Sequence, residues 1–297
     1  MTRSKIDVKV GIEKGGDTMY TQNEPLKKVI EKNKVLIAAH RGTNGGNVLQ
    51  NTCLAYENAL LHGADMIEVD VIRSTDGVFF AFHNGEEEHI LGSKKDIRQM
   101  SSTEIESYCM INAIHQKVSQ KVERLEKVLE TFKGRCLINI DRSWFYWKET
   151  IEYIEHSGMK EQILLKSGVE KELLEQLEQS KSNVMYMPIM KSKDDWEVVK
   201  KYDINVAAVE VIFDTLDHWF VSEEFIKELQ EYGIYAWVNA ITLDDDHVMS
   251  GTLDDNYAIE NGFENSWGKL MELGFTIIQT DWPALLKGYL MNKVGNH

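Results

Sequence analysis

Short apolar runs of strand length alternate with amphipathic stretches along most of this chain, and this alternation limits its possible folds more than any other feature. The apolar runs are Val35–His40, Met66–Asp70, Cys136–Asp141, Ile163–Lys166, Val184–Ile189, Val206–Ile212, Ile234–Asn239 and Thr276–Thr280. Between them lie the helix-like stretches Thr52–His62, Glu123–Phe132, Trp147–His156, Lys171–Lys181, Trp196–Tyr202, Ser222–Tyr232 and Asn265–Leu273. Glycines at several joints from helix to strand are typical of C-terminal caps: Gly63, Gly134, Gly158, Gly233 and Gly274. Eight strands alternating with helices predict an α/β fold, a closed (β/α)8 TIM barrel.

One segment after the second strand interrupts the alternation. Asp76-Gly77 lies between two apolar runs and is a strong signal for a β-hairpin turn. We expect the hairpin to return antiparallel and to place His83 roughly opposite Asp70 or Val71. The polar stretch up to about residue 121 then predicts an insertion, about 71–121, on the rim that shapes a substrate pocket. We expect a single domain over residues 1–297, with its core at about 35–290.

Composition excludes several classes of partner. A net charge of −15 argues against nucleic acid, because a polyanion needs a basic face on the protein. No apolar run reaches the length of a membrane-spanning helix, and the first 25 residues have no hydrophobic signal core. The three cysteines lack metal-type spacing, which is typical of a reducing compartment. We therefore expect a cytoplasmic protein that acts on a small molecule.

Groups suited to phosphate chemistry gather at the ends of the early strands. His40-Arg41-Gly42 follows the first apolar run. Glu68 and Asp70 are two residues apart on the second, and therefore share one face of the strand. His83 ends the run that follows the predicted turn. A lone histidine at a strand end is usually a hydrogen-bonded core residue. Two histidines that converge on a carboxylate pair favour a functional site instead.

These residue types match what cleavage of a phosphodiester requires. His40 and His83 can act as general base and general acid near neutral pH, and Arg41 offers a planar fork for phosphate oxygens. Two adjacent inward carboxylates repel each other unless a cation lies between them. Asp141, at the end of the third strand, is a natural third ligand. Three carboxylates without cysteine favour Mg²⁺ or Ca²⁺ over Zn²⁺, and the sequence does not distinguish the first two.

Polar residues on later strands are weaker candidates. Lys166 ends the fourth strand and either contacts a phosphate or reaches solvent. Glu210, in an apolar run, is either a site residue or half of a structural ion pair. Trp237 and Asn239 end the seventh strand and could line the pocket, although a tryptophan in a strand is more often part of the core.

An ordered series of motifs over about residues 35–285 resembles the glycerophosphodiester phosphodiesterase family of the phospholipase-C-like barrels. The matching segments are His40-Arg41-Gly42, Asn51-Thr52, Ile67-Glu68-Val69-Asp70-Val71, Thr75-Asp76-Gly77 through His83, Ile138-Asn139-Ile140-Asp141 and Gln279-Thr280-Asp281-Trp282-Pro283.

The resemblance implies a (β/α)8 barrel, a divalent metal ion, usually Mg²⁺ or Ca²⁺, and hydrolysis of glycerophosphodiesters to sn-glycerol 3-phosphate and an alcohol. In the family's mechanism a glycerol hydroxyl attacks phosphorus to give a cyclic phosphate that water then opens. The resemblance assigns His40 and His83 to acid–base catalysis, Arg41 to the phosphate, and Glu68, Asp70 and Asp141 to the metal. Asn51, in the matching Asn51-Thr52 segment, is a further candidate for the pocket.

Three positions depart from the family pattern. Gln50 replaces a glutamate, and Asn84 replaces the aspartate after the second histidine. Asp141-Arg142-Ser143 replaces Glu-x-Lys, and we expect Lys166 to supply the missing cation from the next strand. These departures leave two alternatives open: a related barrel enzyme acting on a lysophospholipid or a phosphoinositol, or a non-catalytic phosphodiester-binding barrel.

Overall fold

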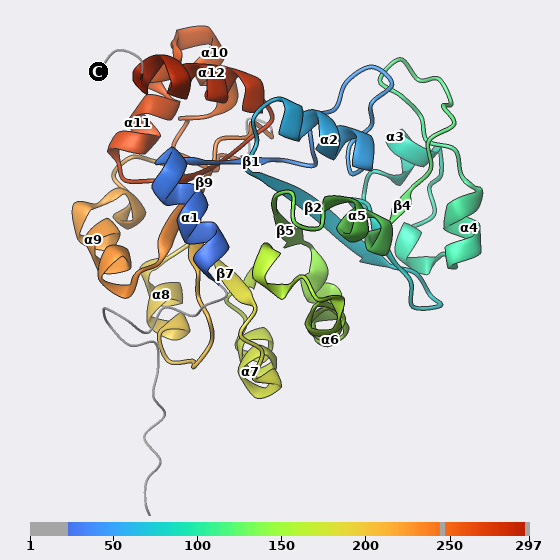
Figure 1. Ribbon diagram of the computed structural model, residues 1–297, viewed down its shortest axis with the longest axis horizontal. Helices are drawn as coiled ribbons and strands as arrows, with labels where there is room; N and C mark the ends of the chain where they lie inside the picture. The colour runs from blue at the N-terminus through green and yellow to red at the C-terminus, as the bar shows by residue number, and fades with distance from the viewer. Residues whose placement is uncertain (1–22, 244–246, 295–297) are drawn as a thin grey trace, which may run out of the picture.

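The computed structural model describes residues 23–243 and 247–294, and its centre is a closed barrel of eight parallel strands (Figure 1). The barrel strands are β1 (Leu36–Ala39), β2 (Met66–Arg73), β5 (Leu137–Asp141), β6 (Ile163–Gly168), β7 (Met185–Met190), β8 (Ala208–Val211), β9 (Tyr235–Asn239) and β10 (Ile277–Thr280). β1 pairs with both β10 and β2, which closes the sheet. The predicted TIM barrel is confirmed, and each strand overlaps one of the eight apolar runs.

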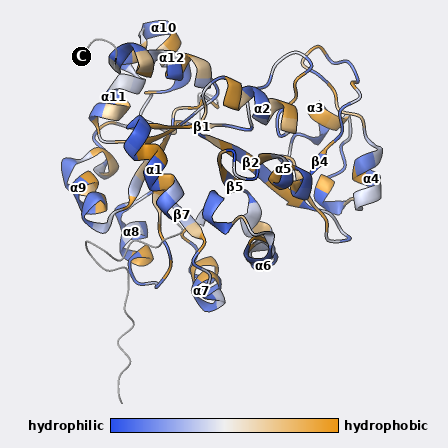
Figure 2. Ribbon diagram, viewed as in Figure 1, coloured by the Kyte–Doolittle hydropathy of each residue, from blue (hydrophilic) through white to orange (hydrophobic). Residues whose placement is uncertain are grey.

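Helices follow the strands and cover the outside of the barrel, and Figure 2 shows polar and apolar residues mixed within them. They are α2 (Cys53–Leu61), α5 (Leu125–Phe132), α6 (Trp147–Ser157), α7 (Lys171–Ser180), α8 (Lys193–Val199), α9 (Glu223–Tyr232), α10 (Asp255–Asn261), α11 (Trp267–Glu272) and α12 (Pro283–Val294). Short 3₁₀ helices lie at Ile97–Gln99, Ser143–Tyr146, Lys160–Gln162, Trp219–Val221 and Phe263–Asn265. α8 begins earlier than predicted because Ser192 and Asp195 form a capping box. Among the described residues, no helix combines the length and apolar character that a membrane crossing needs.

A helix that the sequence interpretation did not predict, α1 (Glu24–Asn33), covers the N-terminal end of the barrel. Its Leu26 and Ile30 pack into the apolar cluster that fills the lower barrel, with Leu36, Ala38, Met66, Leu137, Leu164, Met185, Met187, Ala207, Ala208, Trp237 and Ile277. The expectation that the chain starts without a signal core falls on residues 1–22, which lie outside the described part.

The hairpin after β2 forms, but one residue out of the predicted register. β3 (Phe79–Ala81) runs antiparallel to β2 with Val71 opposite Ala81, and Phe82 N–H donates to the Asp70 carbonyl at 3.0 Å. The turn spans Thr75, Asp76 and Gly77, one residue more than the Asp76-Gly77 pair, and Gly77 takes the positive φ of +91° that the turn needs. The antiparallel return is confirmed, and His83 lies just beyond the end of β3, one position from the place expected roughly opposite Asp70.

The segment after the hairpin is a compact unit beside β2, visible at the right of Figure 1. It contains α3 (Glu87–Leu91) and α4 (Ser102–Ser107), and β4 (Glu123–Arg124) pairs with β3 as a further antiparallel strand. It has an apolar cluster of its own, made of Leu49, Ile72, Phe80, Phe82, Leu91, Ile97, Met100, Ile105, Met110 and Val122. We had expected a mainly polar insertion here; its scattered apolar residues instead meet in this cluster.

Candidate active site

The inward faces of the barrel strands change from apolar to polar toward their C-terminal ends. On β2, Met66 belongs to the apolar cluster, and Glu68 and Asp70 follow it on the same face. Leu137 and Asp141 on β5, Leu164 and Lys166 on β6, Ala208 and Glu210 on β8, and Trp237 and Asn239 on β9 repeat this pattern. Alternation therefore directs a ring of polar groups into one end of the barrel.

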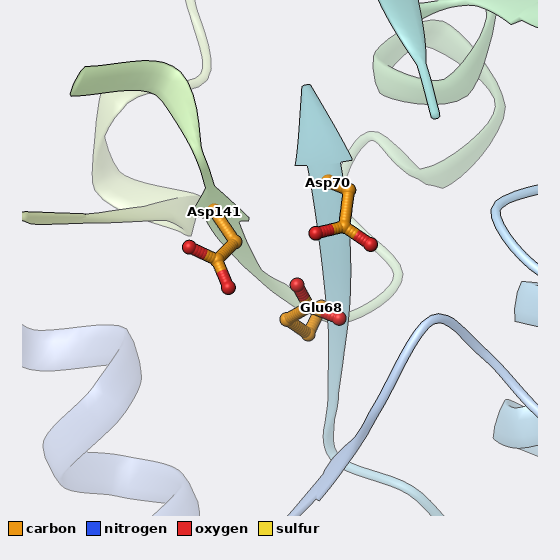
Figure 3. Close-up of side chains that lie close together, drawn as sticks. All are labelled: Glu68, Asp70 and Asp141. Atoms are coloured by element: carbon orange, nitrogen blue, oxygen red, sulfur yellow. The ribbon is translucent and has the colours of Figure 1, made fainter. Parts of the chain in front are cut away.

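Three carboxylates of this ring meet. Asp70 and Asp141 are direct neighbours in the β2–β5 register, and one oxygen from each of Glu68, Asp70 and Asp141 lies within 4.8 Å of the others. Figure 3 shows the three groups turned toward one another. Glu68 and Asp70 are fully buried, whereas Asp141 is partly open to solvent. The structure thus brings together the three residues that the sequence predicted as metal ligands.

The electrostatics of this cluster suit a bound cation. Burial raises the pKa of Glu68 well above its usual value, and Asp70 and Asp141 raise it further. Glu68 Oε2 accepts a hydrogen bond from the Arg41 backbone N–H at 2.8 Å, but its buried Oε1 has no partner among the described residues. A buried acceptor without a donor is costly, and a divalent cation would satisfy it. The donor set therefore fits Mg²⁺ or Ca²⁺.

Arg41 lies over the carboxylates at the end of β1. Its Nε is 3.0 Å from Asp70 Oδ2, and Nη1 donates to Gln50 Oε1 at 3.3 Å. Arg41 and Gly42 both have positive φ, at +52° and +76°, so the chain turns sharply as it leaves the strand. A side chain on Gly42 would lie 2.7 Å from the Ala55 carbonyl carbon, which explains the glycine.

Both predicted histidines lie near Asp70. Burial alone would raise the pKa of the Asp70 carboxyl, but Arg41, then His83, a hydrogen bond from Asn51 and finally His40 hold it below its usual value. His40 Nδ1 is 2.9 Å from Asp281 Oδ1, a partner to which the sequence analysis gave no role. Asp281 directly follows the last barrel strand, just as His40 directly follows the first. These matching positions were the sequence signal that could have predicted the contact.

Burial lowers the pKa of His83, and its Nδ1 has no hydrogen-bond partner among the described residues. Asn84, which replaces the family's aspartate, accepts a hydrogen bond from Arg142 Nε at 2.9 Å. The residue after His83 is therefore tied to the loop that follows β5.

Lys166 lies inside the barrel. Its Nζ is 3.0 Å from Asp141 Oδ2 and 3.1 Å from Glu210 Oε2. Burial would lower the pKa of Lys166, but Asp141 and Glu210 together raise it above its usual value, so the ammonium stays charged. Of the two interpretations of Glu210, the structure shows the ion pair.

The other candidates position this network and do not line an open pocket. Asn239 Nδ2 donates to Glu210 Oε1 at 2.8 Å, and Trp237 Nε1 donates to Asn239 Oδ1 at 2.7 Å. Asn51 Nδ2 donates to Asp70 Oδ2 at 2.9 Å. All are almost inaccessible, because inward positions this deep are covered by the groups above them. None of these four residues is among those that line the cavity beside His40, so their place in a substrate pocket stays a prediction.

A cavity of about 460 Å³ opens beside His40 and Arg41. Its other lining residues are Thr43, Asn44, Gln50, Thr242, Asp255, Asn256, Asp281 and Trp282. Several of these come from the segment between β9 and β10, which has no strand signal and was missed. A larger cavity, of about 780 Å³, touches none of the predicted site residues.

Comparisons with known proteins find similarity in sequence and in fold. A family model described as a domain of unknown function matches residues 186–290. The chain is 24% identical over 278 residues to a glycerophosphodiester phosphodiesterase of Bacillus subtilis, covering 88% of this chain and 89% of the relative.

Two solved structures share the fold. A glycerophosphoryl diester phosphodiesterase from Parabacteroides distasonis superposes with a TM-score of 0.69 and 16% identity, covering 88% of this chain and 87% of the other. An Oleispira antarctica phosphodiesterase, solved with the product sn-glycerol-3-phosphate, gives a TM-score of 0.62 and 15% identity, covering 86% and 96%. The Bacillus subtilis relative and the Parabacteroides distasonis structure are thus both named as glycerophosphodiester phosphodiesterases, which agrees with the family resemblance that the motifs predict.

Proposed function

We propose that this protein hydrolyses glycerophosphodiesters to sn-glycerol 3-phosphate and an alcohol. The observation that carries the proposal is the convergence of two histidines and Arg41 on the buried carboxylates at one end of the barrel. The named relatives support the general reaction, and the product bound in the Oleispira antarctica structure is the one expected here.

In this proposal Glu68, Asp70 and Asp141 hold one divalent cation, Mg²⁺ or Ca²⁺. Their all-oxygen donor set and the unpartnered Glu68 Oε1 support this assignment. When bound, the cation would supply positive charge for the phosphoryl oxygens and lower the barrier to attack on phosphorus.

His40 and His83 are the proposed acid–base pair. One imidazole accepts the proton of the neighbouring glycerol hydroxyl as its oxygen attacks phosphorus, and the other donates a proton to the departing alcohol oxygen. Water then opens the cyclic phosphate with the two roles exchanged. Asp281 orients the His40 ring through Nδ1, which leaves Nε2 for the substrate.

Arg41 and Lys166 are the proposed cations for the phosphate. Arg41 reaches the cluster from β1, and its guanidinium can donate two parallel hydrogen bonds. Lys166 would replace the family lysine absent at Ser143, since its Nζ lies directly beside Asp141. The substrate would have to draw Lys166 partly away from Glu210.

The test is turnover of glycerophosphocholine and glycerophosphoethanolamine with Mg²⁺, with Ca²⁺ and with EDTA, alongside a lysophospholipid and a phosphoinositol. We expect metal-dependent release of sn-glycerol 3-phosphate that His40→Ala and His83→Ala each abolish. His156→Ala, on the outer helix α6, is the matched control and should keep full activity. Turnover confined to the lysophospholipid or the phosphoinositol would refute the proposed substrate. Metal-dependent binding without any turnover would show a non-catalytic barrel.

A further inference from the structure

Asp255, the first residue of α10, is a buried carboxylate to which the proposed mechanism gives no role. Its side chain is almost inaccessible, and burial raises its pKa to about 7. Oδ1 accepts hydrogen bonds from Trp267 Nε1 at 2.9 Å and from Thr280 Oγ1 at 2.8 Å. Oδ2 accepts one from the Asp281 backbone N–H at 2.9 Å. A buried carboxylate of raised pKa beside a cavity is characteristic of functional sites.

The residues that Asp255 holds are also the residues that hold His40. The His40 backbone N–H donates to the Thr280 carbonyl at 3.2 Å, and His40 Nδ1 lies 2.9 Å from Asp281 Oδ1. Asp255 accepts hydrogen bonds from the Thr280 hydroxyl and the Asp281 backbone N–H. One carboxylate from a different element therefore bonds both residues that hold His40 at the end of β10.

Asp281 needs such an anchor because packing does not fix it. Its side chain is 40% exposed, and it sits just beyond the strand. Asp255, in contrast, is nearly saturated: a carboxylate accepts about four hydrogen bonds, and three are already in place. Although Asp255 lines the cavity, it has little capacity left for substrate.

We propose that Asp255 is a positioning residue that fixes Asp281, and through it the ring of His40, in the orientation that acid–base catalysis requires. The inference rests on the proposed function of His40. It assigns a role to the segment between β9 and β10, which joins the outer helices α10 and α11 to the end of the barrel.

The experiment is a double-mutant cycle with Asp255→Asn and Asp281→Asn. An amide at position 255 offers one acceptor oxygen to three donors, so the Asp281 N–H loses its partner. We expect kcat on glycerophosphocholine to fall roughly 10- to 100-fold with KM within about 2-fold, as for a misplaced catalytic group. In the Asp281→Asn background, Asp255→Asn should lower kcat by less than about 2-fold, because the link from Asp255 through Asp281 to His40 is already broken. Asp254→Asn is the matched control, since Asn also caps a helix and the Asp254 side chain accepts its hydrogen bond from the Tyr257 N–H of its own helix.

A second readout does not depend on turnover. In ¹⁵N-histidine NMR above pH 8, with the His40 signal assigned by His40→Gln, the wild type should hold the proton on Nδ1. Asp255→Asn should shift part of the population to the Nε2 tautomer, and Asp254→Asn should not. If the wild type proves inactive, the proposed function fails while this spectrum still tests the positioning role.

Trp267→Phe removes one hydrogen-bond donor to Asp255 and keeps most of the packing. It replaces Asp255→Asn in both experiments if that variant does not fold. Equal losses of kcat in both backgrounds would overturn the proposal, as would a folded Asp255→Asn protein with unchanged kcat and His40 tautomer.

Discussion

Replacing Lys166 with methionine tests the buried charge network most directly. The change removes the ammonium but keeps the length of the side chain. It leaves Glu210 buried without a counter-charge and Asp141 without its nearest one. Breaking a buried ion pair in this way costs about 3–5 kcal/mol of unfolding free energy. At roughly 2 °C per kcal/mol for a chain of this size, Tm should fall by roughly 6–10 °C.

The assay is urea and thermal unfolding in EDTA, so that metal binding does not contribute. Glu210→Gln removes the carboxylate that Lys166→Met leaves unpaired, and it keeps an acceptor for Asn239. The double variant should therefore regain about half of the unfolding free energy that Lys166→Met loses. Lys269→Met, which breaks an exposed pair with Glu272, is the matched control and should cost less than about 1 kcal/mol.

In activity, Lys166→Met should lower kcat/KM by roughly 10- to 1000-fold. A Lys166→Met protein within about 1 kcal/mol of wild type would refute the energetic reasoning, and wild-type kcat/KM would refute the phosphate role.

Three further predictions concern the same end of the barrel. Mg²⁺ or Ca²⁺ should raise Tm in proportion to the logarithm of its concentration, and Glu68→Gln should abolish the rise; an equal rise in both proteins would place the ion elsewhere. Because burial lowers the pKa of His83 below its usual 6.5, folding favours the neutral ring. Stability should therefore fall as pH drops below about 6.5, and less steeply in His83→Gln; parallel pH curves would contradict this. Gly42→Ala should cost about 1–3 kcal/mol in urea unfolding, since its φ is positive and Ala55 blocks the methyl group; unchanged stability would show that this turn can relax.

The barrel could be predicted from sequence because its strands carry a local signal. A strand covered on both faces must be apolar nearly throughout, so each run stands out from the amphipathic helices around it. The carboxylate cluster was predictable for a related reason. Glu68 and Asp70 interrupt such a run two residues apart, and β-strand periodicity alone fixes them on one face.

What the sequence did not predict depends on contacts between distant segments. α1 closes the barrel through Leu26 and Ile30, whose partners lie on strands up to about 250 residues further along the chain. The hairpin register depended on one extra turn residue, which propensity does not resolve. Asp255 sits at the start of a helix in a segment without strand signal, and nothing local distinguishes it from an ordinary capping acid.

In our proposal, Lys166 on β6 takes the role of the lysine that the family pattern has at position 143. Ser143, where the family pattern has a lysine, is buried and its hydroxyl has no partner among the described residues. Neighbouring strands lie about 4.8 Å apart, so a lysine on β6 can reach the same carboxylate, Asp141, that a lysine at position 143, just after β5, would flank. A lysine entering from β6 passes through the barrel interior, where an unpaired ammonium would be unstable, and Glu210 on β8 supplies the compensating charge. We therefore propose that the departure at Ser143 and the buried acid at Glu210 are linked through Lys166.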